Sequence, residues 1–290
     1  MLLINMTMYN LKNMKENVRK RIAELPSPAF AGVVREKTAL SAIAEIKNAS
    51  YDGADMIDLH LSTLEDLSLN TLKKIIDSSN VPVLALDYRA SYSWEYLPYS
   101  EEERISHLLS AVEAGASAVD LQSYTFDALS RTRYHGDDSL SFASLSPMET
   151  VTDKVIIAKQ MALIDSLHAK GVEVLLSCHP KIKMNAEQVL ELALFLERRN
   201  PDIIKIVTVS ENDNDVMESI RATKLLKEKL HTKFAYHLSG KVGSLSRILN
   251  PLFGSHIVFC VDRFNEGSTM EQLLLSKAKA AFDSLRKIKE

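Results

Sequence analysis

Residues 172–209 read VEVLLSCHPKIKMNAEQVLELALFLERRNPDIIKIVTV and contain two short apolar runs separated by a longer helical pattern. The runs at 172–177 and 203–209 are rich in Val, Ile and Leu, as strands of a parallel sheet covered by helices are. The stretch at 186–198 between them spaces its apolar side chains as a helix does. This region therefore predicts a strand–helix–strand unit of a parallel sheet.

The same alternation extends in both directions along the chain. Strands are predicted at 29–34, 55–60, 81–87, 118–122, 172–177, 203–209, 233–238 and 257–261. Helices are predicted at 39–47, 70–77, 101–113, 153–170, 186–198, 216–227, 244–250 and 270–287. Eight strand–helix units in a row favour the α/β class and a closed (β/α)8 TIM barrel.

A doubly wound open sheet is the structural alternative, but it would need fewer strands or a second domain. No GxGxxG follows the first predicted strand, and no GxxxxGK[ST] occurs anywhere in the chain. Dinucleotide-binding and P-loop interpretations therefore lack support.

The whole chain, residues 1–290, is expected to form one barrel domain with two irregular segments. Residues 1–27 precede the first strand as an N-terminal extension, which could place an extra helix across the barrel bottom. Residues 125–152 are long and polar for a connection, and they are predicted to be an insertion after strand four.

The composition limits the classes of function. The 290 residues are 46% apolar, and 35 Lys+Arg against 38 Asp+Glu give a net charge of −3. This balance argues against a general nucleic-acid binder, which would carry a basic excess. No apolar run reaches the ~18–20 residues of a membrane span, and the N-terminus shows no signal-peptide cleavage site. We expect a cytoplasmic protein that acts on a small molecule, with no nucleic-acid or membrane partner.

The two cysteines, Cys178 and Cys260, are too few for a disulfide framework or a multi-cysteine zinc site. Cys178 is adjacent to a histidine, but the sequence assigns it no separate base. It is interpreted as a small packing residue.

Lys205 stands inside the apolar strand at 203–209, between Ile204 and Ile206. Burying a charged amine there is costly, and desolvation lowers the pKa of an amine and favours its use as a nucleophile in Schiff-base chemistry. The alternative is a lysine at the barrel end whose amine reaches water along its aliphatic stem.

His179 directly follows the strand at 172–177, at the barrel rim where active sites of this fold lie. A neighbouring strand would bring its ring close to Lys205, and an imidazole can shuttle protons near neutral pH. The alternative is a polar loop histidine. No cluster at zinc-ligand spacing surrounds it, so no metal is expected.

Three further polar residues follow the last two strands. Arg247 ends the segment SGKVGSLSR at 239–247, where Gly240 and Gly243 permit a tight turn that aims the guanidinium at an anion. Ser268 and Gln272 lie in EGSTMEQ at 266–272 as hydroxyl and amide donors. Alternatively, Arg247 is a surface residue, and Ser268 caps a helix with Glu271 completing a capping box.

The order of these motifs is more specific than any one of them. SCHP at 177–180, then 201–216, 239–255 and GSTMEQ at 267–272 resemble the second half of type I 3-dehydroquinate dehydratases. The resemblance extends from about residue 29 to the C-terminus and is best from about 172. It implies that Lys205 forms a Schiff base with the substrate ketone and that His179 transfers protons. It also implies that Arg247, Ser268 and Gln272 bind the substrate carboxylate.

Strand two departs from that family. The family usually shows E-W-R-x-D at its end, whereas this chain reads Asp58-Leu59-His60-Leu61-Ser62. Asp58 is expected to replace the glutamate with a shorter reach. His60 is expected to replace the arginine, with less charge and no bidentate fork.

Strands three and four also depart. After strand three, Tyr88-Arg89 keeps the family arginine as a substrate-binding residue, but Ser93 stands where the family has a glutamate, and Glu95 is the nearest replacement. Strand four, usually ending D-x-E, ends Asp120-Leu121-Gln122. In the family, the groups of strands two and three contact the substrate hydroxyls and orient the histidine. The hydroxyl-facing end of the pocket is therefore expected to be altered.

The resemblance implies a lyase that dehydrates 3-dehydroquinate to 3-dehydroshikimate (EC 4.2.1.10) in the shikimate pathway, without metal or organic cofactor, as a homodimer. One alternative is a paralogue that uses the same Lys–His imine chemistry on another carboxylated ketone. A second is a non-catalytic regulator that binds a metabolite. Lys205 and His179 argue against the regulator, since pure binding requires neither.

Overall fold

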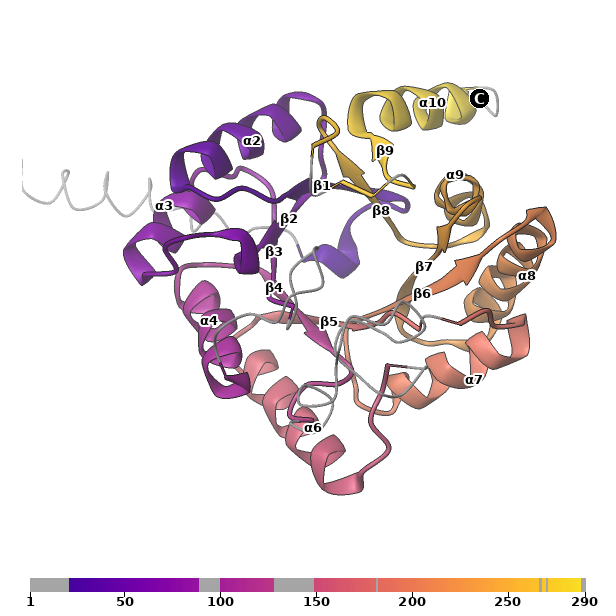
Figure 1. The fold of residues 1–290 in the computed structure, drawn as a ribbon, viewed down its shortest axis with the longest axis horizontal. Helices are drawn as coiled ribbons and strands as arrows, with labels where there is room; N and C mark the ends of the chain where they lie inside the picture. Colours follow the sequence, from indigo (N-terminus) through magenta and orange to yellow (C-terminus); the bar gives the residue numbers. More distant parts are fainter. Residues whose placement is uncertain are drawn as a thin grey trace, which may run out of the picture.

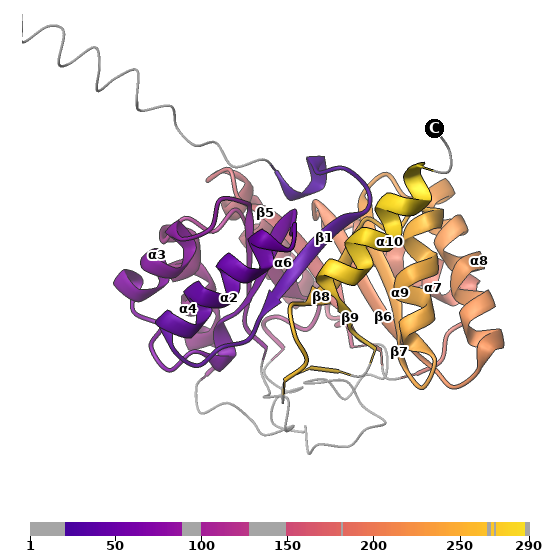
Figure 2. The same cartoon turned by 90° about the horizontal axis from the view of Figure 1, so that it is seen from above.

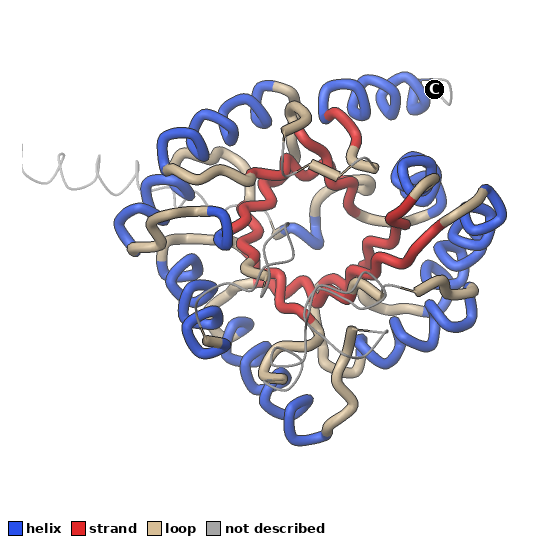
Figure 3. Tube along the Cα trace, in the orientation of Figure 1, coloured by secondary structure: helices blue, strands red, loops and turns tan. Residues whose placement is uncertain are grey.

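Parallel strands form a ring at the centre of the molecule (Figures 1 and 3). The computed structural model describes residues 21–88, 100–127, 149–180, 182–265, 268–269 and 271–287. Its strands are β1 Ala29–Val34, β2 Met56–His60, β3 Val83–Leu86, β4 Ala118–Gln122, β5 Glu173–Cys178, β6 Ile203–Ser210, β7 Lys233–Gly240, β8 Ile257–Val261 and β9 Leu273–Leu274.

From β1 to β7 each strand pairs in parallel with the next in sequence, and β8 pairs with β1. Two hydrogen bonds join β7 to the segment entering β8: His256 N–H donates to the Phe234 carbonyl at 2.7 Å, and Tyr236 N–H donates to Ser255 Oγ at 2.9 Å. These contacts bring the two ends of the sheet together around the barrel axis, as the alternation of strands and helices predicts.

Helices surround the ring (Figure 1). They are α2 Ala39–Tyr51, α3 Leu69–Asp77, α4 Glu101–Glu113, α6 Lys154–His168, α7 Ala186–Glu197, α8 Asp213–Lys229, α9 Gly243–Phe253 and α10 Leu275–Lys287, with short 3₁₀ turns η1 Ile22–Glu24 and η2 Leu61–Thr63.

Side-chain caps decide where several helices begin. Helix α8 starts at Asp213 rather than at the predicted 216, because the Asn212 side chain accepts the N–H groups of Asn214 and Asp215. Helix α10 starts at Leu275 rather than 270, because residues 273–274 pair with β8 as the short strand β9. Backbone pairing therefore replaces a helical turn that the local pattern favours.

The apolar core has two parts. One lies between the outer face of the sheet and the helices, and the other fills the inside of the ring. Alternate residues of a strand face inward, so on β6 the buried Ile203 belongs to the inner core and Lys205 follows it one level nearer the strand's C-terminal end. The inner core thus gives way to polar side chains toward that end.

The barrel bottom is closed by the turn η1, which lies at the end where the strands start (Figure 2). Ile22 is fully buried; its N–H donates to the Glu173 carboxylate, and its carbonyl oxygen lies 2.9 Å from His256 Nε2. The structure describes residues 21–27 of the extension, which contain this 3₁₀ turn, and residues 1–20, where most of the expected extra helix would lie, are outside the described residues. Of the predicted insertion, residues 128–148 lie outside the described residues.

Over the ranges that the structure describes, no helix is both long and apolar enough to cross a membrane.

Gly32 of β1 provides a test of the packing between sheet and helix. A Cβ at this position would lie 2.6 Å from Ala49 Cβ on α2. We expect Gly32→Ala to lower the free energy of unfolding by about 1–3 kcal/mol, because the close-packed layer has no room for a methyl group. Urea titration measures this change.

A second substitution, Ala49→Gly, removes the atom that a new Cβ would meet. The double variant should be more stable than the sum of the two single effects predicts, although a helix glycine itself costs about 1 kcal/mol. Strictly additive effects would show that Gly32 and Ala49 are not in the close contact described here.

Candidate active site

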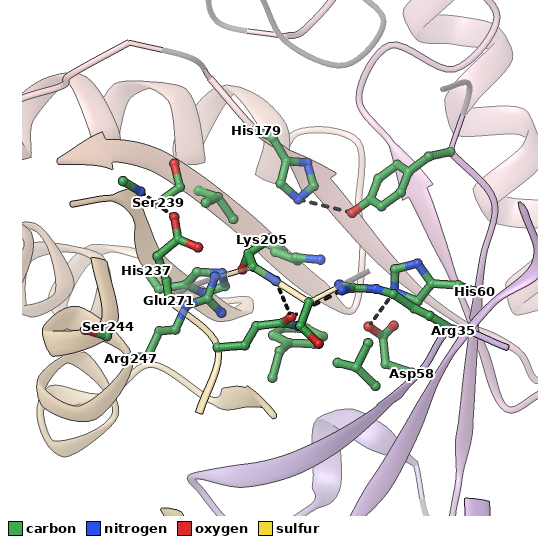
Figure 4. A pocket seen from close by; sticks show the side chains of 18 of the residues that line it. Arg35, Asp58, His60, His179, Lys205, His237, Ser239, Ser244, Arg247 and Glu271 are labelled. Carbon is green, nitrogen blue, oxygen red and sulfur yellow. Dashed lines mark hydrogen bonds and ion pairs between the residues drawn. The ribbon is translucent and has the colours of Figure 1, made fainter. Parts of the chain in front are cut away.

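A cavity of about 930 Å³ opens at the C-terminal ends of the strands (Figure 4). This is the end of a (β/α)8 barrel at which active sites form. The cavity lining includes most of the residues that the sequence singled out: Asp58, His60, His179, Lys205, Arg247, Ser268 and Gln272. The predicted Arg89, and Glu95 as the replacement glutamate, lie outside the described residues.

The Lys205 amine is held inside the barrel. Its Nζ lies 3.4 Å from Asp120 Oδ2 on β4 and 4.4 Å from the centre of the Phe259 ring on β8. Only 6% of Lys205 is exposed, so the amine does not reach bulk water along its stem. Burial raises the pKa of Asp120 above its ordinary value, against the opposing effect of the Lys205 charge.

Polar groups flank both nitrogens of the His179 ring. Nε2 lies 3.2 Å from the Tyr88 hydroxyl, and Nδ1 lies 3.3 Å from Glu149 Oε2. The Glu149 carboxylate also accepts the His179 backbone N–H. His179 is 8% exposed, so its ring faces the cavity while being shielded from solvent.

Cys178 is fully buried, and burial raises the pKa of its thiol well above the ordinary value. Its Sγ lies 3.4 Å from the Glu149 carbonyl oxygen. A buried thiol of this kind is a poor nucleophile, which agrees with its interpretation as a packing residue.

At the end of β2, Asp58 and His60 form a buried pair with Oδ2 and Nε2 3.4 Å apart. Burial, and then the nearby Arg35 charge, lower the pKa of His60 to about 4, so the ring is neutral at pH 7. Burial alone would raise the pKa of Asp58, but His60, Lys205 and Arg35 outweigh it and leave that pKa below its usual value.

Arg247 enters the cavity from the first turns of α9. Ser246 Oγ accepts the Leu238 N–H at 2.8 Å, which fixes the start of the helix against β7. A Cβ on Gly243 would lie 2.6 Å from the Leu238 carbonyl oxygen, so this close approach requires glycine.

Arg247 is 9% exposed, and burial lowers its pKa to about 10. Among the described residues its Nε has no hydrogen-bond partner. A buried guanidinium with an unused donor is suited to binding a carboxylate.

The segment after β8 brings Gln272 into the site. Gln272 is 5% exposed, and its Oε1 accepts Arg35 Nη1–H at 3.2 Å and the Thr269 N–H at 3.0 Å. Ser268 Oγ bonds to Asn265 Oδ1 at 3.0 Å, and the next helix starts only at Leu275. The helix-cap interpretation of Ser268 is therefore wrong.

Glu271 likewise completes no capping box. Its carboxylate accepts the Gly240 N–H at 2.6 Å, which ties the segment after β8 to the end of β7.

Three side chains of the site were not singled out by sequence reasoning. Arg35 directly follows β1, and a polar residue at a strand end was a signal that could have found it. His237 follows Ala235 at the alternate, inward-facing position of β7, and burial followed by the charges of Arg247 and Lys205 keeps its pKa well below the ordinary value. Glu149 lies in the predicted insertion, where no periodic pattern marks it.

Over the part of the chain that the structure describes, no group of three His, Cys, Asp or Glu side chains could hold a metal ion.

Comparison with known proteins places this site in a family. The sequence model described as Type I 3-dehydroquinase matches residues 30–289. A 3-dehydroquinate dehydratase of Klebsiella pneumoniae is 32% identical over 130 residues, which cover 44% of this chain and 51% of that enzyme. The chain thus spans about half the length of this relative. A 3-dehydroquinate dehydratase of Methanosarcina acetivorans is 24% identical over 267 residues, 89% of this chain and 95% of that enzyme.

Solved structures confirm the predicted barrel fold. The crystal structure of 3-dehydroquinate dehydratase from Geobacillus kaustophilus superposes with a TM-score of 0.74 at 15% identity, over 93% of this chain and 97% of that one. The type I enzyme from Clostridium difficile, with covalent modified comenic acid, gives a TM-score of 0.71 at 16% identity, over 91% and 94% of the two chains.

The buried neutral His60 predicts a pH-dependent stability. Its pKa falls from 6.5 to about 4 on folding, so unfolding takes up a proton below pH 6.5. This contribution to stability is complete above pH 6.5 and is lost as pH falls toward 4, by at most about 3 kcal/mol.

The slope of the unfolding free energy against pH reports how many protons the chain takes up on unfolding. We expect His60→Gln to reduce that number by close to one near pH 5. Urea titrations between pH 4.5 and 7.5 measure that slope. His231→Gln changes an exposed histidine and serves as the control. An unchanged slope in His60→Gln would contradict the burial of a neutral ring.

Proposed function

Because this chain belongs to the type I 3-dehydroquinase family, we propose that it dehydrates 3-dehydroquinate to 3-dehydroshikimate through an imine on Lys205. The observation that carries the proposal is the Lys205 amine, buried beside Asp120 in a cavity that His179 and Arg247 also line. The activity places the chain in the shikimate pathway.

In the first step His179 takes a proton from the Lys205 ammonium group, and the neutral amine attacks the ketone carbon of the substrate and forms a carbinolamine. Loss of the oxygen as water then gives an iminium ion bound to the lysine. His179 is proposed to donate the proton that this departing oxygen needs. Asp120 lies 3.4 Å from Nζ, so a negative charge stands next to the positive nitrogen that forms.

In the second step the iminium accepts the electron pair of the adjacent C–H bond, and His179 takes the proton. The C–O bond to the hydroxyl one carbon further breaks, and His179 returns its proton so that water leaves. Hydrolysis of the conjugated imine releases the enone product and restores Lys205. Nε2 of His179 is the atom that accepts the proton. The Tyr88 hydroxyl contacts the same nitrogen, so the substrate must displace it.

The substrate carboxylate is proposed to bind Arg247, with Ser268 and Gln272 from the segment after β8. A guanidinium can hold both oxygens of a carboxylate in a fixed geometry. Support comes from Arg247 Nε, which has no partner within the described ranges, and from the burial of Gln272 within the same cavity. The hydroxyls of the substrate ring are proposed to bind at the end of the cavity that holds Asp58 and His60.

That end also favours a second candidate function, the same imine chemistry on another carboxylated ketone. His60 is neutral where the resembled family has an arginine at the end of strand two. The cation at this end of the cavity is Arg35, which follows β1. A ketone with a different arrangement of oxygens could fit these groups better than dehydroquinate does.

We further propose that the chain works in the cytoplasm as a homodimer. Leu245, Ile248 and Leu252 along α9 are 43%, 37% and 48% exposed and support a contact between copies. Sedimentation at the mass of one 32.4 kDa chain would contradict the dimer.

The proposed activity is tested by following absorbance of the conjugated enone after adding 3-dehydroquinate. We expect Lys205→Met to lose more than about 10³-fold in kcat, since a methionine side chain cannot form an imine. Lys233→Met, an exposed lysine on the neighbouring strand β7, is the matched control and should remain active. Turnover by Lys205→Met at the wild-type rate would refute the imine.

An inactive wild type that still forms a Lys205 imine with another keto acid would instead support the second candidate function. Binding of dehydroquinate without turnover or imine formation would point to a regulator.

Arg247→Lys should raise KM by roughly 10- to 100-fold, because a point charge cannot reproduce two parallel hydrogen bonds. Steady-state kinetics against the surface control Arg221→Lys measure this. An analogue without the carboxylate that bound the wild type as tightly as the substrate would exclude the clamp.

A further inference from the structure

Glu149 is a buried carboxylate outside the motifs that carry the family resemblance. It lies in the segment between β4 and α6, next to the residues that lead into α6, and it is 0% exposed. We propose that Glu149 is the positioning residue of His179. This inference rests on the proposed function and names the group that orients its proton-transfer residue.

The contacts join one carboxylate to two parts of the same residue. Glu149 Oε2 accepts the His179 backbone N–H and lies 3.3 Å from the ring Nδ1, which is an ion-pair distance and not a hydrogen bond in this structure. A single carboxylate oxygen thus contacts both the backbone and the imidazole of His179. Its other oxygen, Oε1, is buried without a hydrogen-bond partner among the described residues, so the carboxylate is committed to His179.

The backbone at Glu149 is held in an unusual conformation. Its φ is 50°, in the left-handed region that residues with a Cβ seldom adopt. The Glu149 carbonyl accepts hydrogen bonds from Ser123 Oγ and Cys178 Sγ, on β4's end and on β5. A conformation of this kind persists only where surrounding contacts fix it, and such residues cluster at functional sites.

Arg199, which follows α7, holds the residues after Glu149. It is 1% exposed, and its Nη2 donates to Thr150 Oγ1 at 3.1 Å and to the Val151 carbonyl at 2.9 Å. Its Nη1 donates to the Ser123 carbonyl at 3.3 Å. The buried Arg199 guanidinium thus holds residues 150 and 151 by hydrogen bonds, while the carboxylate of the preceding Glu149 contacts His179.

A carboxylate at Nδ1 determines what the opposite nitrogen can do. The carboxylate 3.3 Å away favours the proton on Nδ1 by electrostatic attraction, and Nε2 then has its lone pair free for the substrate proton. The negative charge also stabilises the imidazolium that forms when His179 takes that proton, as in other His–carboxylate pairs. Tyr88, Asp120, Lys205 and His237 are the other titratable groups that the structure places around this ring.

This arrangement accounts for a departure noted in the sequence. Ser93 stands where the resembled family has a glutamate after strand three. In the structure a glutamate contacts this histidine from the connection after strand four.

The kinetic test compares Glu149→Gln with Glu45→Gln, a buried glutamate of α2 outside the cavity lining. Glu149→Gln should lower kcat by roughly 10²- to 10⁴-fold, the contribution of a well-placed proton-transfer group, with KM little changed. The inflection of its kcat–pH profile should move to lower pH, because the amide no longer favours the protonated ring. Glu149→Asp should restore part of kcat. Wild-type kcat and an unmoved profile in Glu149→Gln would overturn the proposal.

A second measurement needs neither activity nor a folded variant. Long-range ¹H–¹⁵N NMR of the wild-type chain with labelled histidine reports which ring nitrogen of His179 carries the proton. We expect the Nδ1–H tautomer at neutral pH. The Nε2–H tautomer would overturn the proposal. The tautomer tests the positioning role of Glu149 even if dehydroquinate is not the substrate. Failure of this proposal can therefore be distinguished from failure of the proposed activity.

Discussion

The buried ion pair between Lys205 and Asp120 is the interaction on which the rest of the site depends. Removing an ammonium group from water is costly, and the 3.4 Å contact with Asp120 together with the Phe259 ring offsets part of that cost. The register of the sheet places Asp120 of β4 level with Leu175 of β5 and Ile203 of β6. Asp120 thus lies two residues nearer the strand start than the level of Lys205, within reach of the lysine side chain. The fold supplies the amine with a counter-charge at a fixed place.

The remaining charges of the cavity follow from that arrangement. The cavity lining carries the basic residues Arg35, Lys205, Lys241 and Arg247 against the carboxylic acids Asp58 and Glu271, so basic side chains are in excess. Their repulsion adds to burial in keeping His60 and His237 neutral. The cavity can therefore attract an anionic ketone, while two imidazoles remain as uncharged hydrogen-bonding groups. This electrostatic setting suits a carboxylated substrate better than a neutral one.

The strands and the two proposed catalytic residues could be predicted from the sequence because the local apolar pattern marks both. The apolar run around Lys205 predicts both strand β6 and a buried amine, and the residue after β5 predicts His179 at the rim. The start of α10 was predicted too early, because pairing of Leu273 with β8 is a long-range contact that no local period reports.

The part of the site that was missed depends on contacts between distant segments. Arg35 is an ordinary polar residue in sequence, and only the closed ring brings it within 3.2 Å of Gln272. Glu149 lies in a connection without periodicity, and its role depends on the anchoring by Arg199 and on a left-handed backbone. Residues of this kind are found from the fold, not from spacing along the chain.

The most direct test of the central claim is peptide mass spectrometry after adding 3-dehydroquinate and borohydride to the wild-type chain. Borohydride reduces an iminium to a stable secondary amine, so the account predicts one ligand adduct per chain, located at Lys205. The same adduct on another lysine, or full turnover with Lys205 unmodified, would contradict it.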